Sequence, residues 1–309
     1  MLKESIRILN FDGSLLRQKK LLSRYQAEII DLSSLGPRVR YWMDRGRERL
    51  LMERIHGSSR NCLTFLGSGD FHHLTASLLK EIEKPFCLIS FDLHPDWDVL
   101  PPRLGCGSWV SASLGNERLL KCILVGVSSQ DLSTCGLKSA NLASLKNDRV
   151  EIYPYAHAPT KVFLRRVPVN VSVSAHRGIL STRICWEELK GKNLAEFFIS
   201  ILRRLPIKEV YISVDKDCLR KEFALTNWEE GLLSLDELLL MLKLIKDNLD
   251  ILGMDVVGEY SPILIKSPFK SLVSRFDHPS YVAAQKYPED KVAAINEETN
   301  LRIADFLFS

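Results

Sequence analysis

The segment that decides the fold is Phe86-Cys-Leu-Ile-Ser-Phe91-Asp92-Leu-His94-Pro-Asp96-Trp-Asp98. Its first half is a short and almost entirely apolar run, which is typical of a strand covered on both faces. Its second half carries Asp92, His94 and Asp96 at every second position, and in an extended chain this period places the three side chains on one side. The segment therefore predicts a buried parallel strand that ends in metal-competent side chains.

The rest of the chain alternates short apolar runs with longer segments that have apolar residues at helical spacing. The predicted strands are 6–10, 62–66, 86–91, 122–127, 209–214 and 251–257, and the predicted helices are 38–55, 71–82, 193–203, 235–249 and 291–308. This alternation indicates βα units and a mainly parallel sheet flanked by helices, which is an α/β fold. No repeat or linker divides residues 1–309, so we expect a single domain, with irregular excursions or a cap between residues 128 and 183.

Two further predicted strands end in residues that can bind metals. Asp215 and Asp217 follow strand 209–214 at the same spacing of two, and strand 62–66 leads into Gly67-Ser-Gly69-Asp70-Phe71-His72-His73. Because the carboxyl ends of parallel strands lie along one edge, residues distant in sequence meet there. The predicted cluster consists of His72, Asp92, His94, Asp96, Asp215 and Asp217.

The charge of this cluster predicts how many cations it holds. Its four carboxylates together carry −4, and they repel one another strongly unless cations intervene. One divalent ion leaves −2, whereas two bring the formal sum to zero. Oxygen ligands with some imidazole and no thiolate favour two Mn²⁺, with Zn²⁺ or Fe²⁺ as competitors. Such a pair would lower the pKa of a bridging water and stabilise charge on a carbon under attack, which is hydrolytic chemistry.

Composition excludes several other classes of function. Lys and Arg number 42 and Asp and Glu number 38, so the surplus of 4 gives no case for a nucleic acid or a membrane as partner. The seven cysteines are odd in number and scattered without a CxxC pair, which favours a reduced, cytoplasmic setting. No apolar run approaches 18 residues, so we expect a soluble protein. The expected partner is a small-molecule substrate. The patterns GxGxxG, GxxxxGK[ST] and GxSxG are absent.

Several motifs resemble those of the arginase and agmatinase (ureohydrolase) family. Asp92-Leu-His94-Pro-Asp96 resembles its DAHxD motif, and Ser213-Val-Asp215-Lys-Asp217 resembles the start of its SxDxDxxDP motif. Gly67 to His72 resembles its GGDH element, and Asp255-Val-Val-Gly-Glu259 resembles its DxxE strand, each with one insertion. The resemblance implies a three-layer α/β/α sandwich with a mainly parallel sheet, the fold that arginases share with deacetylase-like enzymes, and commonly a homo-oligomer.

The resemblance also implies a role for each candidate residue. Asp92 and Asp215 would bridge two Mn²⁺, with His72 and Asp96 completing one site and His94 and Asp217 the other. Asp96 would also orient the bridging hydroxide, and Glu259 would pair with the cationic end of the substrate. Separately from the resemblance, Trp109 lies near the predicted strand ends, where an aromatic side chain can line a substrate pocket.

Two departures from the family pattern keep three functions open. Arg220 and Lys221 stand where the family has Asp-Pro, and Gly105-Cys-Gly-Ser108-Trp109 stands where it has a histidine proton shuttle. The leading hypothesis is a binuclear hydrolase of linear C–N bonds that acts on a guanidino or amidino compound. The alternatives are a zinc-dependent deacetylase-like amidohydrolase and a non-catalytic metal-binding protein of the same fold.

Overall fold

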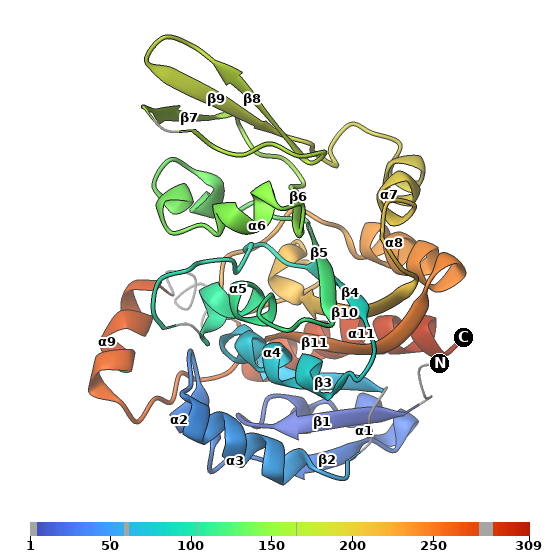
Figure 1. The fold of residues 1–309 in the computed structure, drawn as a ribbon. Helices are drawn as coiled ribbons and strands as arrows, with labels where there is room; N and C mark the ends of the chain where they lie inside the picture. Colours follow the sequence, from blue (N-terminus) through green and yellow to red (C-terminus); the bar gives the residue numbers. More distant parts are fainter. Residues whose placement is uncertain (1–4, 59–61, 103, 165, 278–286) are drawn as a thin grey trace.

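The computed structural model describes residues 5–58, 62–102, 104–164, 166–277 and 287–309. Within these ranges the chain forms a central sheet of eight parallel strands in the order β2-β1-β3-β11-β10-β4-β5-β6 (Figure 1). Its strands are β1 (Ile6–Asn10), β2 (Glu28–Asp31), β3 (Leu63–Ser68), β4 (Phe86–Phe91), β5 (Leu119–Val125), β6 (Val150–Tyr153), β10 (Glu209–Asp215) and β11 (Asp250–Glu259). The strands that precede the predicted ligands, β3, β4 and β10, lie in the middle of this sheet.

Helices cover both faces of the sheet. One face packs against α2 (Gly36–Val39), α3 (Arg45–Ile55), α4 (Thr75–Leu78), α5 (Trp109–Ser113) and α6 (Leu142–Lys146), and the other against α1 (Lys19–Tyr25), α7 (Leu194–Leu202), α8 (Leu235–Asn248) and α11 (Glu289–Phe308). Successive strand residues serve separate cores: Leu88 of β4 belongs to the first, whereas Cys87 and Ile89 belong to the second. This arrangement confirms the predicted α/β/α sandwich with a mainly parallel sheet.

Shorter helical segments connect these elements. They are the 3-10 helices η1 (Leu15–Arg17), η2 (Gly69–Leu74), η3 (Leu79–Glu81), η4 (Cys106–Ser108), η5 (Gln130–Leu132), η6 (Gly136–Lys138) and η7 (Lys216–Cys218). Helix α9 (Pro268–Asp277) follows β11 and packs beside the segment after α2, where Lys270 Nζ donates hydrogen bonds to the carbonyl oxygens of Arg38 (3.1 Å) and Arg40 (3.2 Å).

The predicted strands match the observed ones to within three residues at each end, but two predicted helices are interrupted. In segment 38–55 the chain leaves helical conformation after α2, and α3 begins only at Arg45. The reason is local: the Asp44 side chain accepts a hydrogen bond from the backbone N–H of Arg47 at 2.9 Å and caps the new helix. Segment 71–82 is divided among η2, α4 and η3.

Three strands that the sequence did not predict form a separate antiparallel sheet. They are β7 (Thr160–Phe163), β8 (Val173–Arg177) and β9 (Ser181–Trp186), in the order β7-β9-β8. This sheet, here called the arm, projects beyond the β6 edge of the central sheet (Figure 1). It lies where irregular excursions or a cap were expected, between residues 128 and 183.

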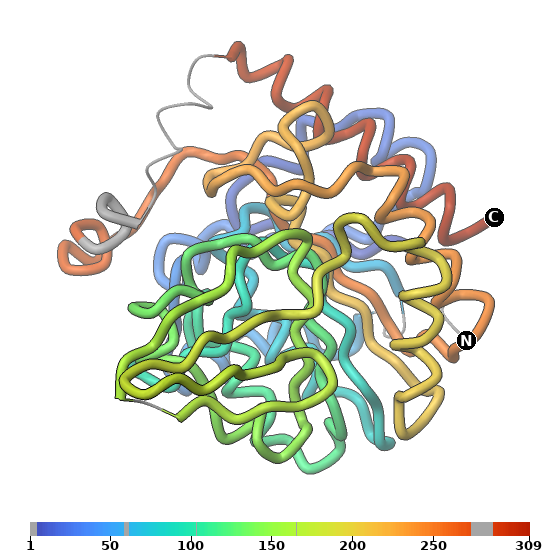
Figure 2. The backbone as a smooth tube through the Cα atoms, turned by 90° about the horizontal axis from the view of Figure 1, so that it is seen from above, coloured from blue at the N-terminus to red at the C-terminus, as the bar shows by residue number. Residues whose placement is uncertain are grey.

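The two ends of the described chain meet on one face of the sheet. Helices α1 and α11 lie side by side (Figure 2), and Glu297 Oε1 accepts a hydrogen bond from the backbone N–H of Leu21 at 3.2 Å. Of the helices in the described ranges, none has the length and apolar character needed to span a lipid bilayer.

Candidate metal centre

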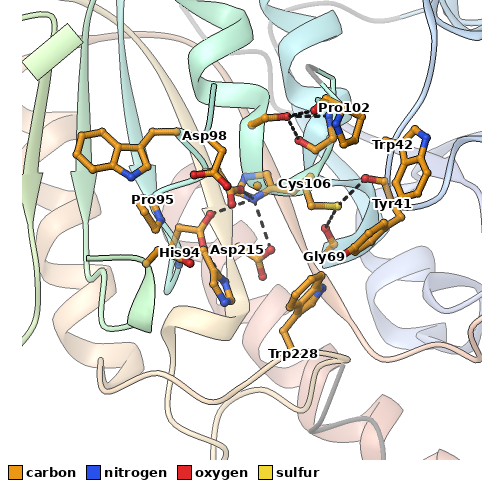
Figure 3. A pocket seen from close by; sticks show the side chains of 18 of the residues that line it. Tyr41, Trp42, Gly69, His94, Pro95, Asp98, Pro102, Cys106, Asp215 and Trp228 are labelled. Carbon is orange, nitrogen blue, oxygen red and sulfur yellow. Dashed lines mark hydrogen bonds and ion pairs between the residues drawn. The ribbon is translucent and has the colours of Figure 1, made fainter. Parts of the chain in front are cut away.

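The six predicted ligands lie together at the carboxyl edge of the central strands. Strand β10 pairs with β4 so that Val214 lies opposite Phe91, which places Asp215 and Asp92 at neighbouring strand ends. Helix η2 brings His72 from β3, which is separated from β10 by β11. All six residues, His72, Asp92, His94, Asp96, Asp215 and Asp217, line one cavity of about 830 Å³ (Figure 3).

The first group of ligand atoms surrounds the His72 ring. Its Nδ1 lies 3.1 Å from Asp92 Oδ2, 3.4 Å from Asp96 Oδ2 and 3.5 Å from Asp215 Oδ2. The ligand atoms of His72, Asp92 and Asp96 all fall within 4.8 Å of one another. One cation can therefore reach an imidazole nitrogen and several carboxylate oxygens at once.

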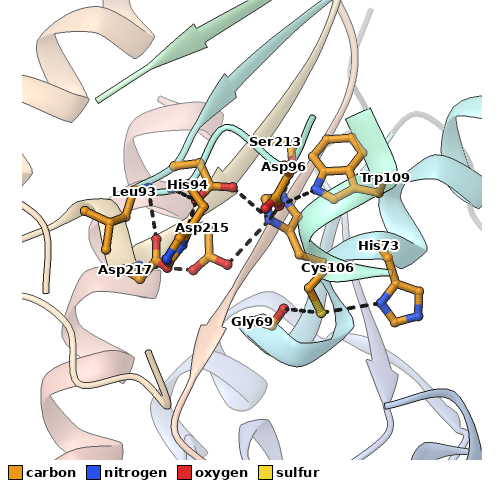
Figure 4. A network of polar contacts seen from close by, with 12 residues as sticks. Gly69, His73, Leu93, His94, Asp96, Cys106, Trp109, Ser213, Asp215 and Asp217 are labelled. Carbon is orange, nitrogen blue, oxygen red and sulfur yellow. Dashed lines mark hydrogen bonds and ion pairs between the residues drawn. The ribbon is translucent and has the colours of Figure 1, made fainter. Parts of the chain in front are cut away.

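The second group surrounds His94 and shares one member with the first (Figure 4). His94 Nδ1 lies 3.1 Å from Asp217 Oδ2 and 3.8 Å from Asp92 Oδ1. Asp92 thus presents Oδ2 to the first group and Oδ1 to the second. A carboxylate shared in this way is what a pair of neighbouring cations requires.

Buried polar residues in the strands fix the orientation of His72. Its Nε2 lies 2.9 Å from Ser213 Oγ, and Ser213 Oγ donates a hydrogen bond to Asp255 Oδ1 at 2.7 Å. Because the Ser213 hydroxyl proton is used on Asp255, its oxygen accepts from the Nε2–H of His72. The lone pair of His72 then lies on Nδ1, which is the state a metal ligand needs.

The metal-free cluster leaves buried polar atoms without hydrogen bonds. In the described part of the chain, His72 Nδ1 and Asp92 Oδ2 are two such atoms, and they face each other at 3.1 Å. In the tautomer that Ser213 selects, both present lone pairs, so their contact is repulsive unless a cation or a proton lies between them. The carboxylate and imidazole donors therefore fit divalent cations.

The same crowding shifts the proton affinities of the cluster. Burial, followed by the charge of Asp217, raises the pKa of Asp215 to about 7. Burial and the charges of Asp96 and Asp217 raise the pKa of Asp92 well above its usual range. Burial lowers the pKa of His72, but the close carboxylates of Asp92 and Asp96 outweigh it and raise that pKa overall. The metal-free cluster therefore retains protons that cations would displace.

Trp109 contacts the ligands themselves. Its indole Nε1–H donates a hydrogen bond of 2.6 Å to Asp96 Oδ2, and its ring lies 4.7 Å from the ring of His72. Asp96 has a φ of 47°, in the left-handed region that side chains other than glycine rarely adopt. Trp109 is fully buried and is not among the residues that line the cavity. It is thus placed to hold Asp96, and its contact with a substrate stays a prediction.

Glu259 also has a different setting from the predicted one. Its carboxylate forms an ion pair with the fully buried Lys216 and accepts hydrogen bonds from Gln18 Nε2 at 2.9 Å and Asn300 Nδ2 at 2.6 Å. It does not line the cavity that holds the six ligands. In the described structure its partner is therefore Lys216, and the pairing of Glu259 with the cationic end of a substrate stays a prediction.

The two basic residues that depart from the family pattern contact groups outside the cavity lining. The Arg220 guanidinium lies 5.6 Å from the ring centre of Phe223, and Lys221 Nζ lies 3.8 Å from Glu230 Oε1. Neither residue lines the cavity. Their positive charges therefore give no reason to exclude a cationic substrate.

His73 and Cys106 lie close to the cluster without joining it. Burial lowers the pKa of His73 to about 3, and its Nδ1 faces Cys106 Sγ at 3.9 Å (Figure 4). The Cys106 thiol lies 3.2 Å from the carbonyl oxygen of Asp70, and burial raises its pKa well above the usual range. A neutral thiol of this kind is a structural group.

The residues that support the ligands were not predicted from the sequence. Ser213 and Asp255 are the pair that orients His72, and they lie opposite each other in the register of β10 and β11. A signal for them exists, because a serine and an aspartate interrupt two strands that are otherwise apolar, and buried polar residues need partners. Lys216 and its partner Glu259 gave a similar signal.

Comparisons with known proteins agree with this architecture. Residues 164–273 match the Arginase family, a range that includes Asp215, Asp217 and Glu259. An uncharacterised protein of Thermotoga maritima is 27% identical over 263 residues, which cover 85% of this chain and 83% of that protein.

Solved structures give the same picture at the level of the fold. Arginase from Bacillus subtilis superposes with a TM-score of 0.56 and 14% identity, over 99% of this chain and 98% of that one. Proclavaminate amidino hydrolase from Streptomyces clavuligerus superposes with a TM-score of 0.53 and 12% identity, over 97% and 93% of the two chains. The fold is that of arginase. The family match over residues 164–273, the shared fold and the order of the motifs are consistent with a divergent member of the ureohydrolase family.

Proposed function

We propose that this chain is a binuclear metal-dependent hydrolase of linear C–N bonds, acting on a guanidino or amidino compound. The observation that supports this most directly is Asp92, whose two carboxylate oxygens face two different groups of ligands. We favour two Mn²⁺, with Zn²⁺ or Fe²⁺ as alternatives. When bound, two such cations lower the pKa of water and stabilise negative charge on the carbon under attack.

The proposed ligand assignments combine the two groups with the motif resemblance. Asp92 would bridge the two cations, as its two oxygens suggest, and Asp215, which lies 3.5 Å from His72 Nδ1, would do so by the resemblance alone. His72 and Asp96 would complete one site, and His94 and Asp217 the other. Support comes from the distances within each group and from the orientation of His72 by Ser213.

Asp96 is the proposed catalytic residue. Trp109 donates to its Oδ2, which leaves Oδ1 as the oxygen that can accept a hydrogen bond from the attacking water and orient it. Trp109 is accordingly proposed as a positioning residue. Glu259 is proposed to hold the end of β11 through Lys216, since its carboxylate is engaged there and not in the cavity.

We further propose that residues 1–309 act as one domain, because the ligand-bearing strands all belong to the central sheet. The size of the cavity suits a small-molecule substrate. All seven cysteines are free, which supports the proposed cytoplasmic setting.

Metal analysis tests the binuclear proposal. The purified chain, saturated with Mn²⁺ and then desalted, is expected to retain two ions. The substitution Asp217→Asn is expected to reduce the content to one, because it removes a ligand from the second group only. Asp236→Asn is the matched control, since Asp236 is an exposed carboxylate that pairs with Arg302. Retention of no metal by the wild type would contradict the proposal.

A substrate panel then separates the three functions. Guanidino, amidino and acylated amine compounds are assayed in parallel with Mn²⁺ and Zn²⁺. Hydrolysis of a guanidino or amidino compound with Mn²⁺ is the expected result. Activity confined to Zn²⁺ and an acylated amine would instead indicate the deacetylase-like amidohydrolase. Two bound metals with no turnover across the panel would favour the non-catalytic metal-binding protein.

A further inference from the structure

The free end of the arm carries a group of exposed apolar side chains. Ile179 is fully exposed, and Leu164, Leu180 and Phe163 have exposed fractions of 88%, 67% and 62%. The four are neighbours, because the backbone N–H of Leu164 donates to the carbonyl oxygen of Leu180 at 3.2 Å and Phe163 lies opposite Ser181. We call these four residues the arm tip. Their burial in an apolar phase would be favourable.

A row of basic residues crosses the arm behind this tip. Arg183 of β9 lies opposite Lys161 of β7 on one side and opposite His176 of β8 on the other. Residues directly opposite each other in antiparallel strands share a face, and the like charges of Lys161 and Arg183 in such positions destabilise the sheet. All three side chains are exposed, and residues 152–186 contain no acidic residue that could neutralise them. This basic row is therefore complementary to an anion.

The spacing between the arm tip and the basic row indicates which kind of molecule carries the anion. Phe163 follows Lys161 by two positions on the same strand, which is about 7 Å along the backbone, and Lys161 Nζ lies 5.3 Å from the centre of the Phe163 ring. A lipid bilayer has a similar spacing between its phosphates and its acyl chains. Apolar groups that insert there reach about 5–10 Å deep, while cations remain at the phosphates. A nucleic acid would satisfy the row but leave the tip in water.

We propose that the arm docks on the surface of an anionic lipid bilayer, with the tip inserted at the acyl boundary and the basic row against the phosphates. A second copy of the chain fits less well, since it would bring a second basic row towards the first. The low net charge of the whole chain concealed this surface. Residues 152–186 hold five Lys or Arg and no acid, so the remainder of a chain with a net charge of +4 carries −1.

Co-sedimentation of the full chain with vesicles tests the proposal. The vesicles contain phosphatidylcholine alone or phosphatidylcholine mixed with phosphatidylserine. We expect binding to the mixed vesicles only, with weaker binding at high salt. Arg183→Ser should reduce the partition coefficient about fivefold, and Ile179→Ser combined with Leu180→Ser should reduce it about tenfold or more.

Two matched controls carry the same chemical changes outside the arm. Arg49→Ser removes an exposed positive charge from α3, and Ile29→Ser removes an apolar side chain of 46% exposure from β2. Both are expected to bind vesicles as the wild type does. All substituted residues are exposed, so unchanged thermal unfolding verifies that each variant is folded.

Three results would overturn the proposal. The first is an absence of binding to the mixed vesicles, and the second is binding that the arm variants reduce no more than the controls. The third is a wild-type oligomer that Ile179→Ser with Leu180→Ser dissociates, which would assign the tip to contact between copies of the chain. None of these results depends on metal content or turnover, so the docking proposal and the proposed hydrolase stand or fall separately.

Discussion

Replacing one proposed metal ligand by its uncharged analogue should stabilise the metal-free protein. The substitution is Asp215→Asn. Burial and the charge of Asp217 raise the pKa of Asp215 from 3.8 to about 7, so ionising this carboxyl is far harder in the folded state than in the unfolded one. Below pH 4 the group is neutral in both states. As pH rises from about 4 to about 7, the unfolded state loses this proton first and the free energy of unfolding falls.

The size of the effect follows from that pKa. A rise from 3.8 to about 7 corresponds to a loss of about 4 kcal/mol of stability above pH 7. For a chain of 309 residues the entropy of unfolding is about 0.65 kcal/mol per degree, so the loss is equivalent to about 6 °C in Tm. Asparagine has no proton to lose. The metal-free variant should therefore melt up to about 6 °C above the metal-free wild type at pH 8, and the difference should shrink towards pH 5.

Thermal unfolding in the presence of a chelator at pH 5 and pH 8 measures this difference, and added Mn²⁺ should reverse the order. The wild type gains stability by binding the ion, whereas the variant lacks a bridging ligand. Asp236→Asn, which removes an exposed carboxylate, should show no gain at either pH. If the metal-free Asp215→Asn protein is less stable than the wild type at pH 8, or if the difference does not depend on pH, the electrostatic account of the cluster is refuted.

Three further changes probe the surroundings of the cluster. Trp109→Phe removes the hydrogen bond to Asp96 and should weaken binding of one of two Mn²⁺ about tenfold in calorimetric titration. The control Trp97→Phe should leave Mn²⁺ binding unchanged, because the Nε1 of Trp97 has no hydrogen-bond partner within the described part of the chain. Lys216→Met leaves the buried Glu259 carboxylate without its ion-pair partner and should lower the free energy of unfolding by about 3–5 kcal/mol in denaturant titration. Adding Glu259→Gln should restore most of that loss. No recovery in the double variant would show that the two residues are not coupled. Because the metal-free cluster holds protons, Mn²⁺ binding should release protons, and its affinity should rise from pH 6 to pH 8. Calorimetry in two buffers of different ionisation enthalpy measures the number of protons released. An affinity that does not depend on pH would contradict this expectation.

The sequence predicted the central part of the fold well because simple physical rules apply there. Strands covered on both faces must be short and apolar, so their runs stand out in the sequence. The period of two then fixes which neighbouring residues share a side. These two rules were sufficient to find β4 with Asp92, His94 and Asp96, and β10 with Asp215 and Asp217. Neither rule depends on the path of the loops that connect the strands.

The arm was missed because its strands follow different rules. Strands β7, β8 and β9 form an antiparallel sheet with one face exposed, so apolar and polar residues alternate and no continuous apolar run appears. The segment also contains Pro159 and Pro168, which favoured an irregular structure over strands. These segments form strands because β9 pairs with both β7 and β8, and a pattern within one short segment does not reveal such pairing.

The position of Glu259 shows that the sequence holds more information than was used. Asp215 and Asp217 line the cavity, whereas Lys216, the first residue of the 3-10 helix η7, does not line it and is fully buried. A lysine that is directed into a buried layer requires a carboxylate, because an unpaired ammonium there is too costly. Glu259 stands at the end of β11, the strand that pairs with β10, and is the carboxylate within reach. The motif resemblance placed Glu259 correctly along its strand, but the charge of Lys216 determines which group that carboxylate binds.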